Sequence, residues 1–145
     1  MTTQFVVLVA LVLLTVVLGT LWRARQGRVR TAPARADLAV DWAARGVVLG
    51  ERATFVQLSA QVCAPCRATA RVLRDVAARE PGVVHHELDV EEHLDLVREL
   101  GVLKTPTVLV LDATGAQAAR SSGGMNPAQA GRALEAALPA PAARA

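Results

Sequence analysis

The chain contains only two cysteines, Cys63 and Cys66, in the stretch QVCAPCR, where Ala64 and Pro65 separate them. If they lie on the first turn of a helix, their Cα atoms are about 5 Å apart, a spacing that a disulfide tolerates. The pair can then be oxidised and reduced without moving the fold. Unpaired backbone N–H groups at a helix N-terminus favour an anion, so Cys63 should ionise more readily than a free cysteine.

The two sulfurs are therefore expected to have different roles. Cys66 lies one turn deeper and should be less accessible than Cys63. We expect Cys63 to attack a partner and Cys66 to resolve the mixed disulfide. Pro65 pre-sets the backbone of the first helical turn and needs no hydrogen-bond donor there. The pattern favours a redox couple that exchanges its disulfide with other thiols.

Two other interpretations of the cysteine pair stay open. A structural metal site needs four ligands, and the pair supplies two. The only histidines are His85, His86 and His93, and the first two point to opposite faces of one strand, so at most one can join. We expect no metal site, because a structural zinc site normally combines two such cysteine motifs. Two inert buried thiols are a poorer fit still, because a junction from strand to helix exposes at least one of them.

The segments around the cysteines alternate between strand and helix patterns. Short β-rich apolar runs predict strands, and apolar residues at helical spacing predict helices. The predicted elements are a strand at 54–59, a helix at 64–80, a strand at 83–88, a helix at 90–100, strands at 107–111 and 117–120, and a helix at 128–138. The run TVLVL at 107–111 is apolar throughout and should be buried on both faces. Asn126 and Pro127 fit the N-cap and first position of the last helix.

The order of these elements predicts the fold class. Strands that alternate with helices require parallel pairs, and the last two strands, joined by a tight turn, should form an antiparallel hairpin. We predict an α/β fold over residues 37–138, with three layers and a mixed central sheet. The helices at 64–80 and 90–100 should each bury one face, formed by Ala68, Val72, Leu73 and Val76 in the first and by Leu94, Val97 and Leu100 in the second.

The N-terminal residues 1–22 carry no charge, and residues 5–22 are almost unbroken Val, Leu and Ala. An apolar helix of this length rises about 27 Å, close to the hydrocarbon thickness of a bilayer. A cleaved signal peptide or a buried core helix would give a similar run. Because Met1–Gln4 has no Lys or Arg, we predict an uncleaved transmembrane anchor at 1–22, with Trp22 at the interface.

Residues 23–36 are predicted to form a basic linker, which contains Arg23, Arg25, Arg28, Arg30 and Arg35 and no acid. Basic residues beside a spanning helix favour the cytoplasmic side. We therefore expect a single-pass protein of the cell membrane with its domain on the cytoplasmic face; the alternative is an extracytoplasmic domain.

The distribution of charge also bears on partners. All 13 acids lie from Asp37 onward, so the basic excess belongs to the linker, where it suits anionic lipid head groups. With no Tyr and two Phe, the chain offers few stacking platforms, and we expect no nucleic-acid partner. We also expect a short helix at Ala36–Ala44, a disordered tail at 139–145 and a monomer.

Three stretches resemble the thioredoxin-like thiol-disulfide oxidoreductases. These are FVQLSAQVCAPCR as strand, redox motif and helix start, GVLKTPTVLVLDATG as proline loop and hairpin, and GGMNPAQAGRALEAAL as the last helix. The similarity covers about residues 52–138 and leaves the N-terminal segments unexplained. It implies a thioredoxin fold and exchange with protein thiols and disulfides. It also implies no cofactor, because the Cys63–Cys66 disulfide itself carries two electrons.

The same resemblance implies a substrate groove. Thr105–Pro106 would be a cis-proline step beside the cysteines, where the Thr105 backbone meets an extended substrate chain, and Gly124 would let a partner approach. The alternatives are a proline that only starts a strand and a glycine that only marks a loop. A rival of another class is a non-enzymatic thioredoxin-like adaptor, or a metal-delivery module that uses both sulfurs.

The chain departs from the family pattern at several positions near the cysteines. Gln57 stands where many thioredoxins carry a buried Asp, and a neutral residue there should make a thiolate easier to form, because like charges disfavour ionisation. Val62 and Ser59 replace aromatic residues, which predicts a smaller docking surface, and Ala64 replaces a glycine. Lys104 is expected close to the site. His85 and His86 are expected on a central strand, one facing the core.

Overall fold

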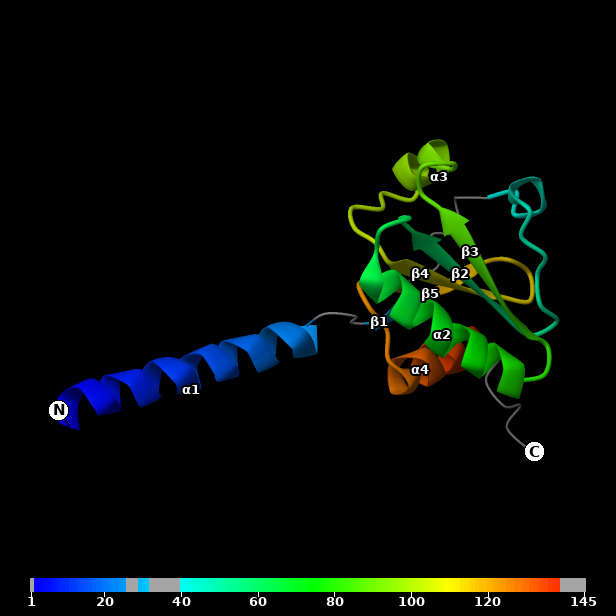
Figure 1. The fold of residues 1–145 in the computed structure, drawn as a ribbon. Helices are drawn as coiled ribbons and strands as arrows, with labels where there is room; N and C mark the ends of the chain where they lie inside the picture. The colour runs from blue at the N-terminus through cyan, green and yellow to red at the C-terminus, as the bar shows by residue number, and fades with distance from the viewer. Residues whose placement is uncertain (1, 26–28, 32–39, 139–145) are drawn as a thin grey trace, which may run out of the picture.

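The computed structural model describes residues 2–25, 29–31 and 40–138 of the chain. A long helix, α1 (Thr2–Arg25), precedes a domain of strands and helices (Figure 1). The remaining elements are β1 (Val29–Thr31), the 3-10 helix η1 (Ala43–Arg45), β2 (Ala53–Ser59), α2 (Ala64–Arg79), β3 (Val83–Asp89), α3 (Leu94–Glu99), β4 (Thr107–Asp112), β5 (Gln117–Ser122) and α4 (Pro127–Ala137). From β2 onward, the predicted order of strands and helices is confirmed.

The strands form one mixed sheet in the order β1-β5-β4-β2-β3. β2 and β3 run parallel, because the helix α2 connects them as a crossover, and the other neighbouring pairs are antiparallel. β4 and β5 form the predicted hairpin. The strand that leads to the cysteines, β2, is therefore central, and β3 is an edge strand.

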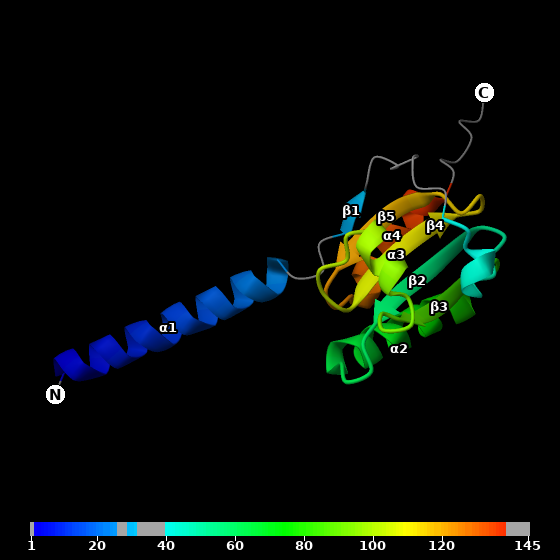
Figure 2. The ribbon, with the colours of Figure 1, turned by 90° about the horizontal axis from the view of Figure 1, so that it is seen from above.

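Helices cover both faces of this sheet, with α2 and α4 on one face and α3 on the other (Figures 1 and 2). Phe55 of β2 packs on the first side with Leu73 of α2. Its neighbour Val56 packs on the second side with Leu96 of α3. Alternate residues of β2 thus enter two separate cores, as the pleat of a strand requires. The predicted three-layer α/β architecture is confirmed.

The two central strands are buried along nearly their whole length. All seven residues of β2 and the first five of β4 are buried, which confirms the prediction for 107–111. A strand covered on both faces can be apolar at every position. These strands form a rigid base for the loop that follows β2 and for the loop that precedes β4.

The predicted buried face of α2 is partly wrong. Ala68 is exposed, whereas Thr69 and Ala70 are buried beside Leu73. The Thr69 hydroxyl accepts a hydrogen bond from the backbone N–H of Met125 at 3.1 Å. A buried threonine with a specific partner is invisible to a pattern that counts apolar residues alone.

Helix α3 is shorter than the predicted 90–100. It begins at Leu94, which is 51% exposed, while Leu96 is fully buried and Leu100 is 5% exposed. The residues before Leu94 form a turn instead of helix, so the inward face starts later than the apolar spacing suggests. The prediction for Leu94 is wrong, and that for Leu100 is confirmed.

Strand β1 differs from the prediction of a linker at 23–36. α1 continues to Arg25, and Val29–Thr31 pairs antiparallel with β5. Valine and threonine are β-branched and favour strands, but three residues give almost no periodic signal. β1 forms because the edge of β5 offers backbone groups for pairing.

Two other predicted segments lie partly or wholly outside the described residues. Residues 36–39 of the predicted helix Ala36–Ala44 and the tail 139–145 are not described. At the end of the predicted helix, η1 is a single 3-10 turn.

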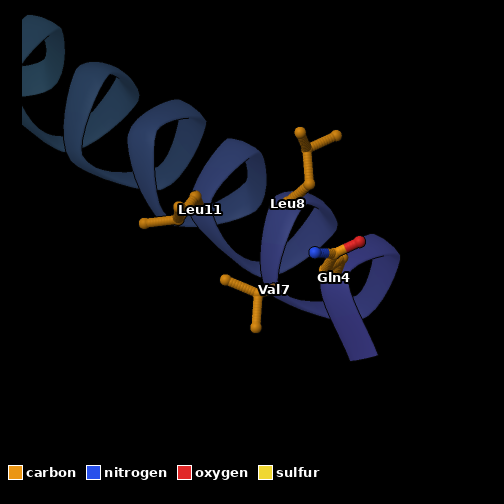
Figure 3. Close-up of a pocket in the computed structure, with 4 residues that line it drawn as sticks. All are labelled: Gln4, Val7, Leu8 and Leu11. Atoms are coloured by element: carbon orange, nitrogen blue, oxygen red, sulfur yellow. The ribbon is translucent and has the colours of Figure 1, made fainter. Parts of the chain in front are cut away.

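The helix α1 has an apolar surface along its whole middle part. Gln4–Leu21 has a mean hydropathy of 2.6, and none of it is buried. A helix of this length and composition can cross a membrane, and a signal sequence has the same properties. The hollow lined by Gln4, Val7, Leu8 and Leu11 belongs to this helix alone (Figure 3), so it is remote in the chain from the cysteines.

Candidate functional site

Cys63 and Cys66 form a disulfide, with their Cα atoms 5.2 Å apart. Cys63 is the N-cap of α2, and Pro65 lies in its first turn. The Sγ atom of Cys63 accepts a hydrogen bond from the backbone N–H of Cys66 at 3.2 Å. This contact satisfies one of the free N–H groups of the helix start, and the same group can stabilise a thiolate after reduction. Cys63 is 8% exposed and Cys66 is 2% exposed, which is the expected order. Both cysteines are nevertheless buried, so the expectation that the strand-to-helix junction exposes at least one of them is wrong, because Thr105 of the proline loop lies beside Cys63.

Thr105 and Pro106 lie directly beside the disulfide. The peptide bond between them is cis, and the Oγ1 atom of Thr105 is 3.9 Å from the Sγ atom of Cys63. The strand β4 starts at Thr107, which pairs with Leu58 near the end of β2. Two neighbouring central strands therefore bring the proline loop and the cysteines to the same end of the sheet.

The turn after β5 reaches the same place. Gly123 has a φ of 105°, which favours glycine, and its N–H donates to the carbonyl oxygen of Pro106 at 2.7 Å. At Gly124, an added Cβ would lie 4.0 Å from the Cβ of Pro65. Gly124 therefore lies against the helix turn that carries the cysteines.

A polar network lies beneath the disulfide. Gln57 is fully buried, and the two hydrogens of its Nε2 atom are shared among three acceptors: the backbone carbonyl of Cys66 at 3.0 Å, Ser59 Oγ at 2.8 Å and Glu87 Oε1 at 3.1 Å. Ser59 Oγ also donates to Glu87 Oε1 at 2.7 Å. Position 57 itself is neutral, but a carboxylate from the neighbouring strand reaches Gln57.

Glu87 is the residue of this network that the sequence interpretation missed. Gln57 and Glu87 are opposite one another in the parallel pair of β2 and β3. Residues that lie opposite one another in neighbouring strands share a face of the sheet. The contact between Gln57 and Glu87 could therefore have been predicted only if the pairing register of β2 and β3 had been known, and the local sequence does not specify that register.

The two histidines lie on an edge strand, not on a central one as expected. β3 is the last strand of the sheet, and Nε2 of His86 donates to the carbonyl oxygen of Val48 at 2.9 Å. His85 is half-buried, and its Nε2 atom has no hydrogen-bond partner among the described residues. Burial lowers the pKa of His85 to about 4, and the charge of Glu87 opposes this shift.

The loops next to the cysteines expose two apolar side chains. Val62 is 98% exposed and directly precedes Cys63, and Leu103 is 96% exposed and precedes the Thr105–Pro106 step. Lys104 and Ala64 are also exposed. Over residues 2–25, 29–31 and 40–138, no three His, Cys, Asp or Glu side chains gather in a group that suits a metal ion.

The three-layer fold, the disulfide at a helix start and the neighbouring cis-proline define a protein of the thioredoxin fold. The family model for thioredoxin matches residues 44–136, more than half of the chain. The protein belongs to the thioredoxin family. The resemblance inferred from three sequence stretches is thereby confirmed, together with the thioredoxin-like fold.

Curated relatives and solved structures agree with this membership. The chain is 38% identical to the mitochondrial thioredoxin of Bos taurus over 66 residues, which cover 45% of this chain and 40% of the relative. It is 25% identical to the thioredoxin NaTrxh of Nicotiana alata, with a TM-score of 0.54 over 61% of this chain and 76% of that one. A thioredoxin of Fasciola hepatica gives 25% identity and a TM-score of 0.53, over 61% of this chain and 83% of that one. The chain spans less than half the length of the curated relatives that it matches.

Proposed function

We propose that the protein is a thiol-disulfide oxidoreductase that is tethered to a membrane and acts on protein substrates. The observation that carries this proposal is the disulfide between Cys63 and Cys66 at the start of α2, with Thr105 3.9 Å from the outer sulfur. A disulfide held at a helix N-terminus, beside an unpaired loop, suits exchange with another polypeptide.

In the reduced protein, the Cys63 thiolate attacks one sulfur of a partner disulfide. A new S–S bond forms as the partner's S–S bond breaks, and the released partner thiolate takes a proton from solvent. Cys66 then loses its proton to solvent, and its thiolate attacks the sulfur of Cys63. This step forms the Cys63–Cys66 disulfide and releases the second partner thiol, so that two electrons have passed to the partner. The reverse sequence oxidises a partner dithiol.

The chain segments beside the dithiol suit an extended substrate. The Thr105 side chain lies 3.9 Å from Cys63, and its backbone comes shortly before β4, so a substrate segment can align with that backbone as an added strand does. Gly124 leaves room for that segment, since it has no side chain to cover Pro65. Ala64 and Pro65 shape the turn between the sulfurs. We propose Thr105, Pro106 and Gly124 as substrate-binding residues and the cysteines as the catalytic residues.

The partners follow from this chemistry. Protein thiols and disulfides are the substrates. No organic cofactor is needed, because the cysteine pair carries the electrons. The protein acts as a monomer and without nucleic acid.

The membrane tether is α1, whose segment Gln4–Leu21 is long and apolar enough to span a bilayer. The arginines after it favour a domain on the cytoplasmic face. On the cytoplasmic face the protein reduces its partners, because the thiol pools of the cytosol keep its cysteine pair reduced.

Insulin reduction driven by dithiothreitol tests the activity in the full chain. We expect turnover with the natural sequence, its loss in Cys63→Ser, and a stable mixed disulfide with insulin in Cys66→Ser. The adaptor alternative predicts no turnover and unchanged capture of a partner when both cysteines are serine. The metal-delivery alternative predicts that zinc or copper ions bind the reduced chain and that insulin stays oxidised. Either result overturns the proposal.

A further inference from the structure

The strand β1 links the anchor helix to the sheet. α1 ends at Arg25 and β1 begins at Val29, so four Cα steps separate them. Four steps span at most about 14 Å, even in an extended chain. From Leu21, the end of the apolar window, α1 rises about 6 Å to Arg25. Val29 therefore lies within about 20 Å of the hydrocarbon when α1 spans a bilayer.

The register of β1 fixes which end of the sheet lies at this position. Val29 is opposite Ser121 of β5, and the next residue, Ser122, is opposite Thr107 of β4. Gly123 follows directly and donates its N–H to Pro106. The first residue of β1 thus lies at the end of the sheet that carries the cis-proline loop and the disulfide.

The distance across the sheet is short. Val29 and Val108 both pair with Ser121, so they are two strands apart, about 10 Å. In Figure 1, α1 meets the domain on the side where α2 begins. The opposite end of the sheet carries the turn between β4 and β5, which includes Ala113. The site end of the domain is therefore tied to the membrane by a short connection, and the far end is not.

We propose that the dithiol faces the membrane surface and that its substrates are disulfides of membrane proteins, in segments within about 30 Å of the hydrocarbon. This distance adds the strand spacing across the sheet to the reach of the tether. The proposal rests on the proposed function. It narrows the partner class from protein disulfides in general to those on the polypeptide segments next to a bilayer.

The surface at this end of the domain suits such a partner. Val62, which precedes Cys63, and Leu103, two positions before Thr105, are almost fully exposed. Lys104, which follows Leu103, and Arg67, which follows Cys66, are also exposed. Apolar and basic side chains together fit a segment that leaves an anionic bilayer. The exposed acids Glu91 and Glu92 follow β3 at the same end of the sheet as the cysteines, because β2 and β3 are parallel, but on the edge opposite β1.

The exchange on this partner is the reaction already given. The Cys63 thiolate forms a bond with one partner sulfur, the partner's S–S bond breaks, and Cys66 completes the transfer of two electrons. Dithiothreitol supplies those electrons in the assays below. The proposal adds the position of the partner disulfide relative to the bilayer, and two experiments test this position.

The first experiment measures depth without redox chemistry. The full chain with Cys63→Ser and Cys66→Ser is placed in vesicles of phosphatidylcholine and phosphatidylglycerol that contain a head-group spin-labelled lipid. A fluorophore is attached through Val62→Cys at the site end or through Ala113→Cys at the far end. We expect the lipid to quench the label at position 62 several-fold more strongly. Equal quenching, or stronger quenching at position 113, overturns the proposal.

The second experiment measures substrate choice with the native cysteines. Two membrane-spanning peptides are reconstituted with the full chain, one with a disulfide loop four residues after its spanning helix and one with the same loop on a helical spacer of 40 residues, about 60 Å. We expect the near disulfide to be reduced at least tenfold faster. A variant with 30 Gly and Ser residues inserted between Arg25 and Val29 should lose this preference, because the domain then samples both heights.

Insulin reduction distinguishes a failure of the proposed function from a failure of the membrane-facing inference. If the vesicle-bound chain fails to reduce insulin, or does not remain with the vesicles, the proposed function fails. If it reduces insulin and remains with the vesicles but reduces both peptides at equal rates, only the membrane-facing inference is overturned. The insertion variant should reduce insulin at the rate of the natural chain.

Discussion

The side-chain amide of Gln57 donates a hydrogen bond to the backbone carbonyl of Cys66, at 3.0 Å. A neutral amide thus lies beneath the resolving cysteine, at the position where many thioredoxins carry a buried acid. Its other polar contacts lead to Ser59 and to Glu87, whose side chain is exposed. The Glu87 carboxylate is therefore in contact with water, and its field at the sulfurs is screened.

We predict that replacing the amide by a carboxylate makes the cysteines less reactive. In the reduced natural chain, alkylation of Cys63 by iodoacetamide should reach half its maximal rate below pH 8.5, the midpoint of a free thiol. Gln57→Asp should move this midpoint upward by about one pH unit, because a buried like charge opposes thiolate formation. The measurement is the alkylation rate against pH, followed by mass spectrometry.

Gln117→Asp is the matched control for this experiment. It introduces the same charge at the far end of the sheet, where Gln117 pairs with Leu111. Its alkylation profile should coincide with that of the natural chain. A natural midpoint at or above pH 8.5 would contradict the view that the helix start and the neutral amide favour the thiolate.

A second prediction concerns the stability that Glu87 supplies. Glu87→Gln replaces a carboxylate that accepts hydrogen bonds from Ser59 and Gln57 by a weaker acceptor. We expect the free energy of unfolding to fall by about 1 kcal/mol, measured by urea denaturation of the oxidised chain. Glu91→Gln, an exposed change just after the same strand, should alter it by less than about 0.5 kcal/mol. Equal losses in the two variants would show that the network does not stabilise the fold.

The histidine on the inward side of β3 makes stability depend on pH. Burial lowers the pKa of His85 to about 4, against 6.5 in an unfolded chain. Between these values the unfolded state binds more protons than the folded state, so the free energy of unfolding rises with pH across this window and falls on acidification. The full effect would be at most about 3 kcal/mol, and exposure of part of the ring reduces it to about 1–2 kcal/mol.

The matching experiment compares urea denaturation at pH 7.5 and pH 4.5. His85→Leu should lose less stability on acidification than the natural chain by about 1–2 kcal/mol, because it has no ring to protonate. His93→Gln removes a histidine elsewhere and should keep the acid loss that His85 causes. If His85→Leu and the natural chain lose the same amount, protonation of this ring does not contribute.

A further prediction separates two neighbouring glycines. Gly124→Leu should fold, because the first atom of its side chain meets Thr69 and Pro65 at ordinary contact distances of 3.8 and 4.0 Å. It should reduce insulin about tenfold more slowly, since the side chain covers the approach to the dithiol, a change of about 1.4 kcal/mol in the barrier. Reduction of a small aromatic disulfide should change much less.

Gly123→Ala should show the opposite behaviour. Its φ of 105° strains any residue with a Cβ, so we expect a loss of about 1 kcal/mol or more in unfolding free energy. The insulin rate of the folded fraction should stay closer to that of the natural chain than the rate of Gly124→Leu. If Gly124→Leu reduces insulin at the natural rate, Gly124 does not lie on the docking path.

Much of the domain could be predicted because its local patterns agree with its global order. The apolar run at 107–111, the capping residue Asn126 and the alternation of strand and helix each point to one architecture. The features that were predicted wrongly depend on contacts with distant parts of the chain. β1 is a strand only because β5 offers an open edge, and Thr69 is buried because Met125 lies opposite it.

The candidate site divides in the same way. Cys63 and Cys66 are near neighbours in the sequence, so helix geometry alone predicts their spacing and their order of exposure. Thr105 and Pro106 required the resemblance, since Thr105 is 42 positions from Cys63 in the sequence. Glu87 required the register of two parallel strands, which depends on packing that no local stretch contains.

The indole of Trp42 donates to the carbonyl oxygen of Gly115 and is 7% exposed, in the core on the α3 side of the sheet. The position before the first cysteine is Val62, and Trp42 bonds to the turn between β4 and β5, at the end of the sheet opposite the sulfurs. With Trp22→Phe in the full chain, excitation at the red edge of the absorption band would select this single chromophore. Its fluorescence emission would report on the integrity of that core, and reduction of the disulfide would hardly change the emission spectrum.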